Sequence, residues 1–140
     1  IGRRHLRSNN SWMHNFHRLV KGKDRTQLLM HPQDMAARGI TDGTNVIISS
    51  RVASLEVSVS ASTDMMPGVV SLPHGYGHNR DGARLHIAAE LPGISMNDLT
   101  DDRDVDPLSG NAVLNGIPVS VAAPAGTAET RADARTPATA

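Results

Sequence analysis

The chain has 140 residues, the length of one domain with a single core, and its 39% hydrophobic and 20% charged residues suit a globular protein. Lys+Arg and Asp+Glu both total 14, so no net charge draws in nucleic acid or an anionic membrane, and neither is expected as a partner. Cysteine is absent, which excludes disulfides, iron–sulfur ligation and cysteine nucleophiles and is compatible with a cytoplasmic setting.

The chain begins with a polar, basic stretch and not with an initiator methionine, so we expect a piece of a longer protein. Residues 2–15 place cationic, amide and hydroxyl groups around Trp12. Such groups can match the edge of a pterin or bind a pyrophosphate. A solvated basic arm is the competing interpretation, and composition alone favours it.

Local signals predict a helix and two strands in the next segment. Residues 27–30 form a short apolar run, after which Pro32 suits the first position of a helix that Gly39 closes. A tight turn over 41–44 precedes a strand over 45–50. Residues 55–60 alternate between apolar and polar, which predicts a strand with one buried face.

The second half of the chain has weaker periodicity. We expect a strand over 69–72, a long loop over 73–84, a short helix near 95–99 and a closing strand over 117–122. Residues 123–140 hold no hydrophobic anchor, so we expect a disordered tail there and a folded domain over 1–122. Short strands, tight turns and one or two short helices indicate a mainly β barrel.

Aromatic residues are scarce and lie outside the predicted strands. Only Trp12, Phe16 and Tyr76 are present, so the core must be built from Val, Ile, Leu, Met and Ala. Rings in polar loops either contact a planar ligand or cover the ends of a barrel, and both interpretations remain open.

Several ligand motifs can be weighed against their spacing. Gly75 and Gly77 permit close backbone approach to a ligand, but Arg80 replaces the third glycine of a dinucleotide fingerprint. The histidine pairs 14/17 and 74/78 have chelating intervals for a helix, yet neither stretch looks helical, so no metal site is predicted. The acidic run 101–106 lacks the glycine and glutamate of a calcium loop and is interpreted as a solvated loop.

An ordered series of short motifs carries more information than any one of them. The series is Gly2-Arg3, Ser11-Trp12-Met13, His31-Pro32-Gln33-Asp34-Met35-Ala36, Gly39-Ile40, Asp42-Gly43, Val46, Ser49-Ser50-Arg51, Pro67-Gly68-Val69-Val70, Pro73-His74, Asn97-Asp98-Leu99-Thr100, Asp106-Pro107-Leu108-Ser109 and Val119. In this order it resembles the molybdopterin dinucleotide-binding, C-terminal domain of the dimethyl sulfoxide reductase superfamily of molybdenum/tungsten oxidoreductases, which includes formate dehydrogenases and nitrate reductases. The resemblance covers nearly all of residues 1–122.

The resemblance implies a double-psi β-barrel that closes over molybdopterin guanine dinucleotide, with molybdenum or tungsten carried by the full enzyme. Its partners would be the remaining domains of the parent oxidoreductase. An earlier domain supplies the protein ligand of the metal in such enzymes, so no catalytic residue is expected here and the chain alone is expected to be inactive. The implied cofactor-binding residues are Arg3, Arg4, His5, Arg7, Ser8, Asn10, Ser11, Trp12, Met13, His14, His74, Tyr76, His78, Asn97 and Asn115.

Two points qualify the functional interpretation. Many relatives carry a Tyr-Lys pair where this chain has Leu114-Asn115, so a charged contact is replaced by an amide. The alternative function is a double-psi barrel adaptor that binds a peptide or protein partner. A self-processing pyruvoyl decarboxylase is disfavoured, because Ser109-Gly110 has the wrong order for backbone cleavage.

Overall fold

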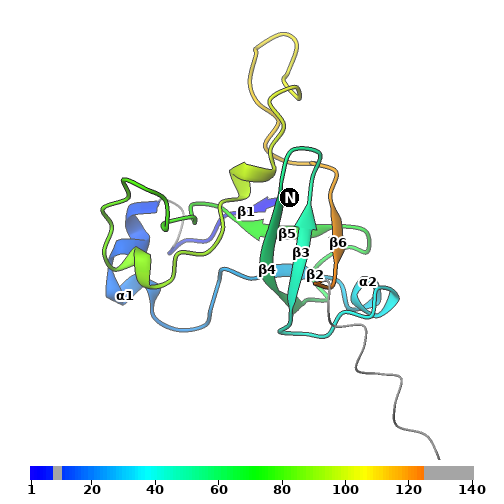
Figure 1. Cartoon of the computed structure of the whole chain (residues 1–140), viewed down its shortest axis with the longest axis horizontal. Coiled ribbons are helices and arrows are strands. Elements are labelled where there is room, and N and C mark those ends of the chain that lie inside the picture. Colours follow the sequence, from blue (N-terminus) through cyan, green and yellow to red (C-terminus); the bar gives the residue numbers. More distant parts are fainter. Residues whose placement is uncertain (8–10, 125–140) are drawn as a thin grey trace, which may run out of the picture.

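One sheet of six strands forms the centre of the molecule in the computed structural model, which describes residues 1–7 and 11–124 (Figure 1). The strands are β1 (Gly2–Arg3), β2 (Leu28–Met30), β3 (Asn45–Ser49), β4 (Ser54–Ala61), β5 (Val70–Pro73) and β6 (Ser120–Ala122). The helices are all short. The prediction of a mainly β fold with short helices is therefore confirmed.

The sheet is mixed and has two ends. Its order is β1-β5-β2-β4-β3-β6, and no pairing joins β1 to β6 among the described residues. The β1–β5 and β2–β4 pairs are parallel, whereas β2–β5, β3–β4 and β3–β6 are antiparallel. Because the hydrogen-bonded ladder does not close, the expected double-psi barrel is not confirmed.

Strands β3 and β4, both predicted from the sequence, pair with each other as an antiparallel hairpin. Val57 and Val59 of β4 are buried and Leu55 is half-buried, while Glu56 between them is exposed. The Ser50 N–H donates to the Ala53 carbonyl at 2.8 Å and so closes the turn. One apolar face thus drives the pairing.

Helix α2 (Pro32–Ala37) begins and ends at the predicted residues. The His31 side chain accepts a hydrogen bond from the Gln33 N–H, and Pro32 occupies the first turn, where no N–H is needed. Gly39 follows with a φ of +65°, a left-handed conformation that favours glycine, and it terminates the helix.

The core contains aliphatic side chains and methionines, as the scarcity of aromatic residues predicted. Leu28, Met30, Val46, Ile48 and Val59 are almost completely buried. Trp12 and Phe16 are 63% and 57% exposed, so they contribute little to this core. The two rings are therefore available on the surface of the lobe that lies beside the sheet.

The first twenty residues are more helical than the sequence suggested. A 3₁₀ turn, η1 (Ser11–Asn15), is followed by helix α1 (His17–Val20), so the interpretation of a non-helical stretch around His14 and His17 was wrong. The reason is local: the Phe16 carbonyl accepts from the N–H groups of Leu19 and Val20 without any side-chain cap. Such uncapped turns leave no sequence signature.

The later segments differ from the predictions mainly at their ends. Two further 3₁₀ turns occur, η2 (Ala88–Glu90) and η3 (Met96–Leu99), and the latter confirms the predicted short helix. Strand β6 begins three residues later than expected, after Pro118, which has no N–H to donate to a ladder. Of the predicted tail, only residues 123 and 124 lie within the described part. No helix of that part is long and apolar enough to cross a membrane.

Candidate functional site

The candidate site combines a first segment, residues 3–15, with a second segment, residues 74–78. In Figure 1 the N-terminal helices and the stretch that follows β5 form a lobe beside the sheet. Strand β1 pairs in parallel with β5, with Gly2 opposite Leu72 and Arg3 opposite Pro73. Both segments therefore leave the sheet side by side and in the same direction.

Arg3 is used by the fold itself. Its guanidinium donates to the carbonyls of Ser71 at 2.6 Å, Gln27 at 2.6 Å and Arg25 at 3.0 Å. The side chain thereby ties β1 to β5 and to the residues that lead into β2. Burial lowers the pKa of Arg3, and the nearby Tyr76 and Asp24 oppose that shift. The structure thus places this predicted cofactor residue in a structural contact.

The residues after Arg3 point to solvent. Arg4, His5 and Arg7 are exposed, as are Ser11 and Trp12 in η1, and Met13 is half-buried. The Arg7 N–H donates to His5 Nδ1 at 3.1 Å, which folds the segment locally. Ser8 and Asn10 lie outside the described residues. Two exposed guanidinium groups and an exposed indole in the same segment suit a phosphate and a planar ring.

Three rings join the two segments. His14 and His78 are 2% and 8% exposed, and His14 Nδ1 lies 2.7 Å from His78 Nε2. Tyr76 stacks on His14, with ring centroids 4.1 Å apart. These three predicted site residues are therefore brought together, although the two histidines face each other and not solvent.

His74 packs against the first strand. Its N–H donates to the Arg3 carbonyl at 2.9 Å, and a methyl group at Gly2 would overlap its ring. Partial burial, followed by the charge of Arg4, lowers the pKa of His74. A neutral imidazole at this position can both donate and accept a hydrogen bond.

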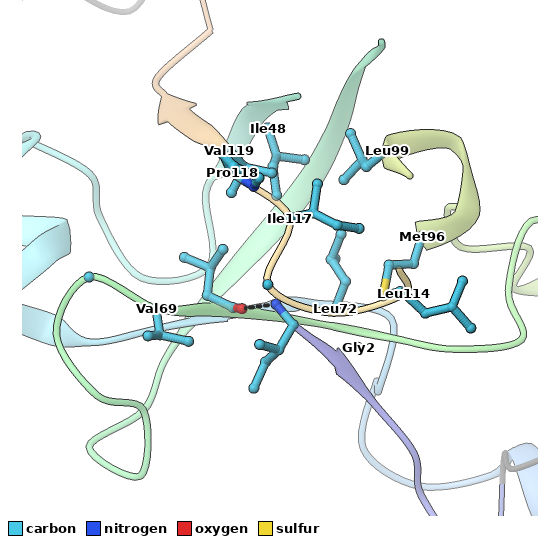
Figure 2. A pocket seen from close by; sticks show the side chains of 14 residues that line it. Gly2, Ile48, Val69, Leu72, Met96, Leu99, Leu114, Ile117, Pro118 and Val119 are labelled. Atoms are coloured by element: carbon cyan, nitrogen blue, oxygen red, sulfur yellow. Dashed lines mark hydrogen bonds between the residues drawn. The ribbon is translucent and has the colours of Figure 1, made fainter. Parts of the chain in front are cut away.

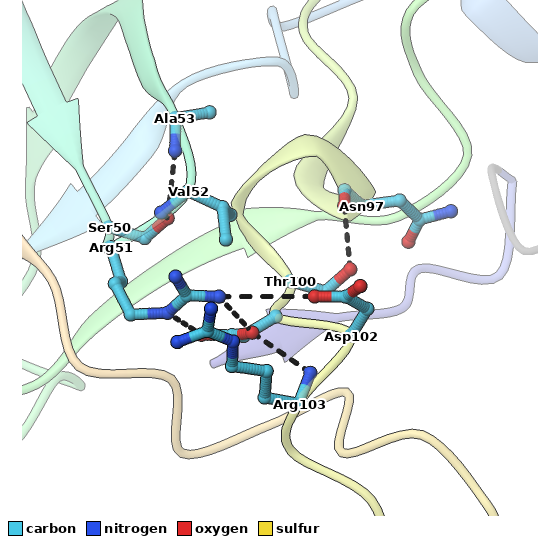
Figure 3. Close-up of polar contacts among 9 residues, drawn as sticks. Ser50, Arg51, Val52, Ala53, Asn97, Thr100, Asp102 and Arg103 are labelled. Carbon is cyan, nitrogen blue, oxygen red and sulfur yellow. Dashed lines mark hydrogen bonds and ion pairs between the residues drawn. The ribbon is translucent and has the colours of Figure 1, made fainter.

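Asn97 is exposed in η3 between buried Met96 and Leu99, which anchor the turn in the core. The same methyl group at Gly2 would lie 2.7 Å from Met96 Sδ, so η3 packs on β1 close to His74. Figure 3 shows the Asn97 side chain pointing away from the neighbouring Arg51 contacts. An amide in that position faces the surface near the second segment.

Asn115 stabilises the N-terminal strand. Its Oδ1 accepts a hydrogen bond from the Gly2 N–H at 2.8 Å. The side chain thus links β1 to the residues that precede β6, across the gap between the two ends of the sheet. The predicted ligand role of Asn115 competes with this contact.

The charges of the chain are unevenly distributed. Seven of the fourteen Lys and Arg residues lie in residues 1–25 against one acidic residue, a local formal charge of +6 with histidine neutral. At the other extreme, Asp101, Asp102 and Asp104 lie on a projecting arm after η3, where Arg51 pairs with Asp101 and Asp102 (Figure 3). Residues 1–25 are thus the part of the molecule whose charge suits an anionic ligand.

An apolar cavity of about 370 Å³ lies elsewhere, between β1 and the residues before β6 (Figure 2). Its lining includes Leu72, Met96, Leu99, Ile117 and Val119, all aliphatic or methionine side chains. The terminal amine of the chain donates to the Val70 carbonyl at 2.8 Å beside it. A lining of this kind does not suit a phosphate or a pterin edge, so this cavity is not the candidate site.

The sequence did not reveal the residues through which the two segments are held against residues 87–95. Asn15 Oδ1 accepts from the Ile87 N–H at 2.9 Å and from the Ala88 N–H at 3.3 Å. The Gly77 N–H donates to the Pro92 carbonyl at 2.7 Å, and a methyl group at Gly77 would lie 2.8 Å from Ser95 Cβ. Nothing in one sequence distinguishes such a supporting asparagine or glycine from one that contacts a ligand.

Comparison with known proteins places these segments in a family. The family model described as "Molydopterin dinucleotide binding domain" matches residues 1–118. A tetrathionate reductase chain of Salmonella typhimurium is 30% identical over 121 residues, covering 74% of this chain and 12% of that protein. The molybdopterin-containing subunit of arsenate respiratory reductase from Chrysiogenes arsenatis is 29% identical over 114 residues, covering 78% and 13%.

A solved structure supports the fold. Acetylene hydratase from Pelobacter acetylenicus superposes with a TM-score of 0.61 at 19% identity, over 88% of this chain and 18% of that protein. Measured against the tetrathionate and arsenate reductase chains, this chain spans only about an eighth of their length. No comparison supports the alternative of a peptide-binding adaptor.

Proposed function

This chain belongs to the molybdopterin dinucleotide-binding domain family, and we propose that it binds molybdopterin guanine dinucleotide as the cofactor-covering domain of a larger oxidoreductase. The observation that carries the proposal is the meeting of a basic first segment with the 74–78 segment beside β1. The other domains of the parent protein would be its partners, in keeping with the small share of each relative that the chain covers.

The donors present in the two segments fit such a cofactor. Arg4 and Arg7 would hold the pyrophosphate, since exposed guanidinium groups form charge-assisted bonds to phosphate oxygens. Trp12 offers an exposed ring face, and His74 and Asn97 offer groups that both donate and accept at the edge of a pterin or guanine. When bound, the cofactor supplies redox chemistry at its molybdenum or tungsten, and the residues of this chain bind and orient it.

The two ends of the sheet lie close enough together to suggest a closed barrel. We infer a double-psi β-barrel, because Gly2 at one end of the sheet and Val119 near the other line the same cavity (Figure 2). The Asn115 side chain bridges the two ends by its bond to the Gly2 N–H. A crystal structure of the full-length protein tests this inference by the strand connections around the seam.

The binding proposal is tested on the full-length protein that carries this chain. Pterin and guanine nucleotide released by denaturation are measured per folded protein, for the wild type and for Arg7→Met. We expect wild-type protein to contain the dinucleotide and Arg7→Met to lose it at least about ten times faster on dilution, because one charge-assisted contact is worth about 1.5–3 kcal/mol.

Arg38→Met is the matched control, because Arg38 is also exposed but lies at the end of α2, away from the two segments. This variant should retain cofactor as the wild type does. Full-length protein without any pterin dinucleotide, or equal loss from both variants, would contradict the proposal.

A further inference from the structure

A buried histidine pair joins two segments that are 64 residues apart in the sequence. His14 comes from η1 and His78 from the end of the second segment, and His14 Nδ1 lies 2.7 Å from His78 Nε2. Both side chains are more than nine-tenths buried. The two nitrogens that face each other are therefore engaged with each other and do not face a ligand.

A contact between two imidazole nitrogens requires a defined protonation state. One nitrogen must carry the proton and donate, and the other must present its lone pair, so a single proton is shared between them. Two imidazolium rings would place two donors 2.7 Å apart and would repel each other. The contact therefore holds only while at least one of the rings is neutral.

The surroundings of the pair oppose a second proton. Burial lowers the pKa of His78. Arg7 and Arg25 line the small hollow that also contacts His14 and Tyr76, and both carry positive charge. The phenol ring of Tyr76 stacks on His14. Among the described residues, the charged groups that line this hollow, Arg7 and Arg25, are thus both cationic.

The pair is also held rigidly from both sides. Tyr76 meets His14 at an interplanar angle of 24°, and a methyl group at Gly93 would lie 2.9 Å from the Tyr76 ring. His78 meets His14 edge to face at 84°. Asn15, next to His14, accepts from the backbone of Ile87. A displacement of either segment would therefore disturb the other.

We propose that His14 and His78 are positioning residues, whose shared-proton contact fixes the first segment against the second and so places Trp12 and His74 for the dinucleotide. The inference rests on the proposed function, because it assigns the exposed side chains to the cofactor and the buried pair to the spacing between them. It also makes cofactor retention sensitive to acid, although neither histidine contacts the cofactor.

The test uses full-length protein and three variants. His78→Phe keeps a ring of similar size but removes the hydrogen bond, and His78→Gln keeps one group that can donate or accept. His17→Phe is the matched control, because His17 lies three residues from His14 and is exposed on α1. Hydrogen–deuterium exchange of peptides that cover residues 11–15 and 74–78 is measured along with the rate of pterin loss on dilution.

We expect His78→Phe to raise exchange in both peptides and to lose pterin about tenfold faster, in line with the loss of one buried hydrogen bond. His78→Gln and His17→Phe should stay within about twofold of the wild type at neutral pH. Pterin loss from the wild type should accelerate only at a pH below the ordinary histidine value of about 6.5, because burial lowers the pKa of His78 and the contact is lost only when both rings are charged. His78→Gln should lack that acceleration.

Three results would overturn the inference. In the first, His78→Phe raises hydrogen exchange in residues 74–78 but not in residues 11–15. In the second, His78→Gln loses pterin as fast as His78→Phe does. In the third, pterin loss from the wild type and from His78→Gln depends on pH in the same way. If His78→Phe does not fold, the rate of pterin loss from His78→Gln and its dependence on pH still test the inference. If wild-type protein holds no pterin, the proposed function fails, while the exchange data still report whether the two segments are coupled.

Discussion

Replacing Arg3 with Met should destabilise the fold by about 3 kcal/mol, more than any exposed arginine of this chain would. Methionine keeps much of the apolar stem of arginine but has no donor. The change therefore leaves the carbonyls of Ser71, Gln27 and Arg25 without the guanidinium that they now share.

The magnitude follows from the burial of these acceptors. Ser71 is 2% exposed, so water cannot easily replace the lost bond, and an unsatisfied buried carbonyl costs about 1–3 kcal/mol. Gln27 and Arg25 are only half-buried, and each lost bond there costs about 0.5–1 kcal/mol because solvent compensates in part. Together these terms give about 3 kcal/mol, or roughly 10 °C in Tm for a domain of this size.

Urea unfolding of the 140-residue chain, followed by circular dichroism, measures this loss. Arg3→Lys should fall between the wild type and Arg3→Met, because one ammonium group cannot span three carbonyls as the guanidinium fork does. Arg4→Met is the control, since Arg4 is the next residue and is exposed. A loss below about 1 kcal/mol for Arg3→Met, or equal losses at Arg3 and Arg4, would refute the structural role.

Three further predictions follow from the site and the chain ends. Asn97→Ala should speed cofactor loss from the full-length protein about tenfold without lowering its Tm, because the amide is exposed to solvent. The rate of pterin release measures the loss. Truncation after Ala122 should leave the Tm of the chain within about 2 °C of the wild type in calorimetry, because β6 ends at that residue. The pKa of His78 is lowered by burial, and that of His74 by burial and then by Arg4. As the pH falls, these histidines therefore become protonated in the unfolded chain before they do so in the folded one. The folded state should keep its full stability above about pH 6.5 and lose stability as the pH falls toward the lowered pKa values of the two histidines. Tm measured between about pH 8 and pH 5 checks this direction.

Local signals account for the elements that the sequence predicted well. Pro32 and Gly39 bound α2 because each has a backbone preference that acts without any tertiary partner. The β3–β4 hairpin follows from alternation along β4 and a short turn at Ser50. Where the structure depends on neighbouring residues alone, the sequence was therefore sufficient.

Contacts between distant residues account for what could not be predicted. The β1–β5 ladder joins Gly2 to Leu72, and its two-residue strand has no pattern of its own. An arginine that grips backbone carbonyls, such as Arg3, looks like one that binds phosphate until its partners are known. The same holds for His14, whose partner is 64 residues away. The resemblance to a family indicated which segments matter, but not which side chains face outward.

The zero net charge of the chain concealed the property that the candidate site uses. Screening at physiological ionic strength limits the reach of a surface charge to about 8 Å, so an anionic ligand responds to the charges beside it and not to their total. The basic residues before Thr26 and the acidic arm after Thr100 lie at different parts of the molecule (Figure 1). A pyrophosphate at the first segment would therefore respond to the nearby Arg4 and Arg7 and only weakly to the carboxylates of the arm. Dinucleotide retention should consequently weaken with added salt, as it would not for a ligand held by apolar contacts.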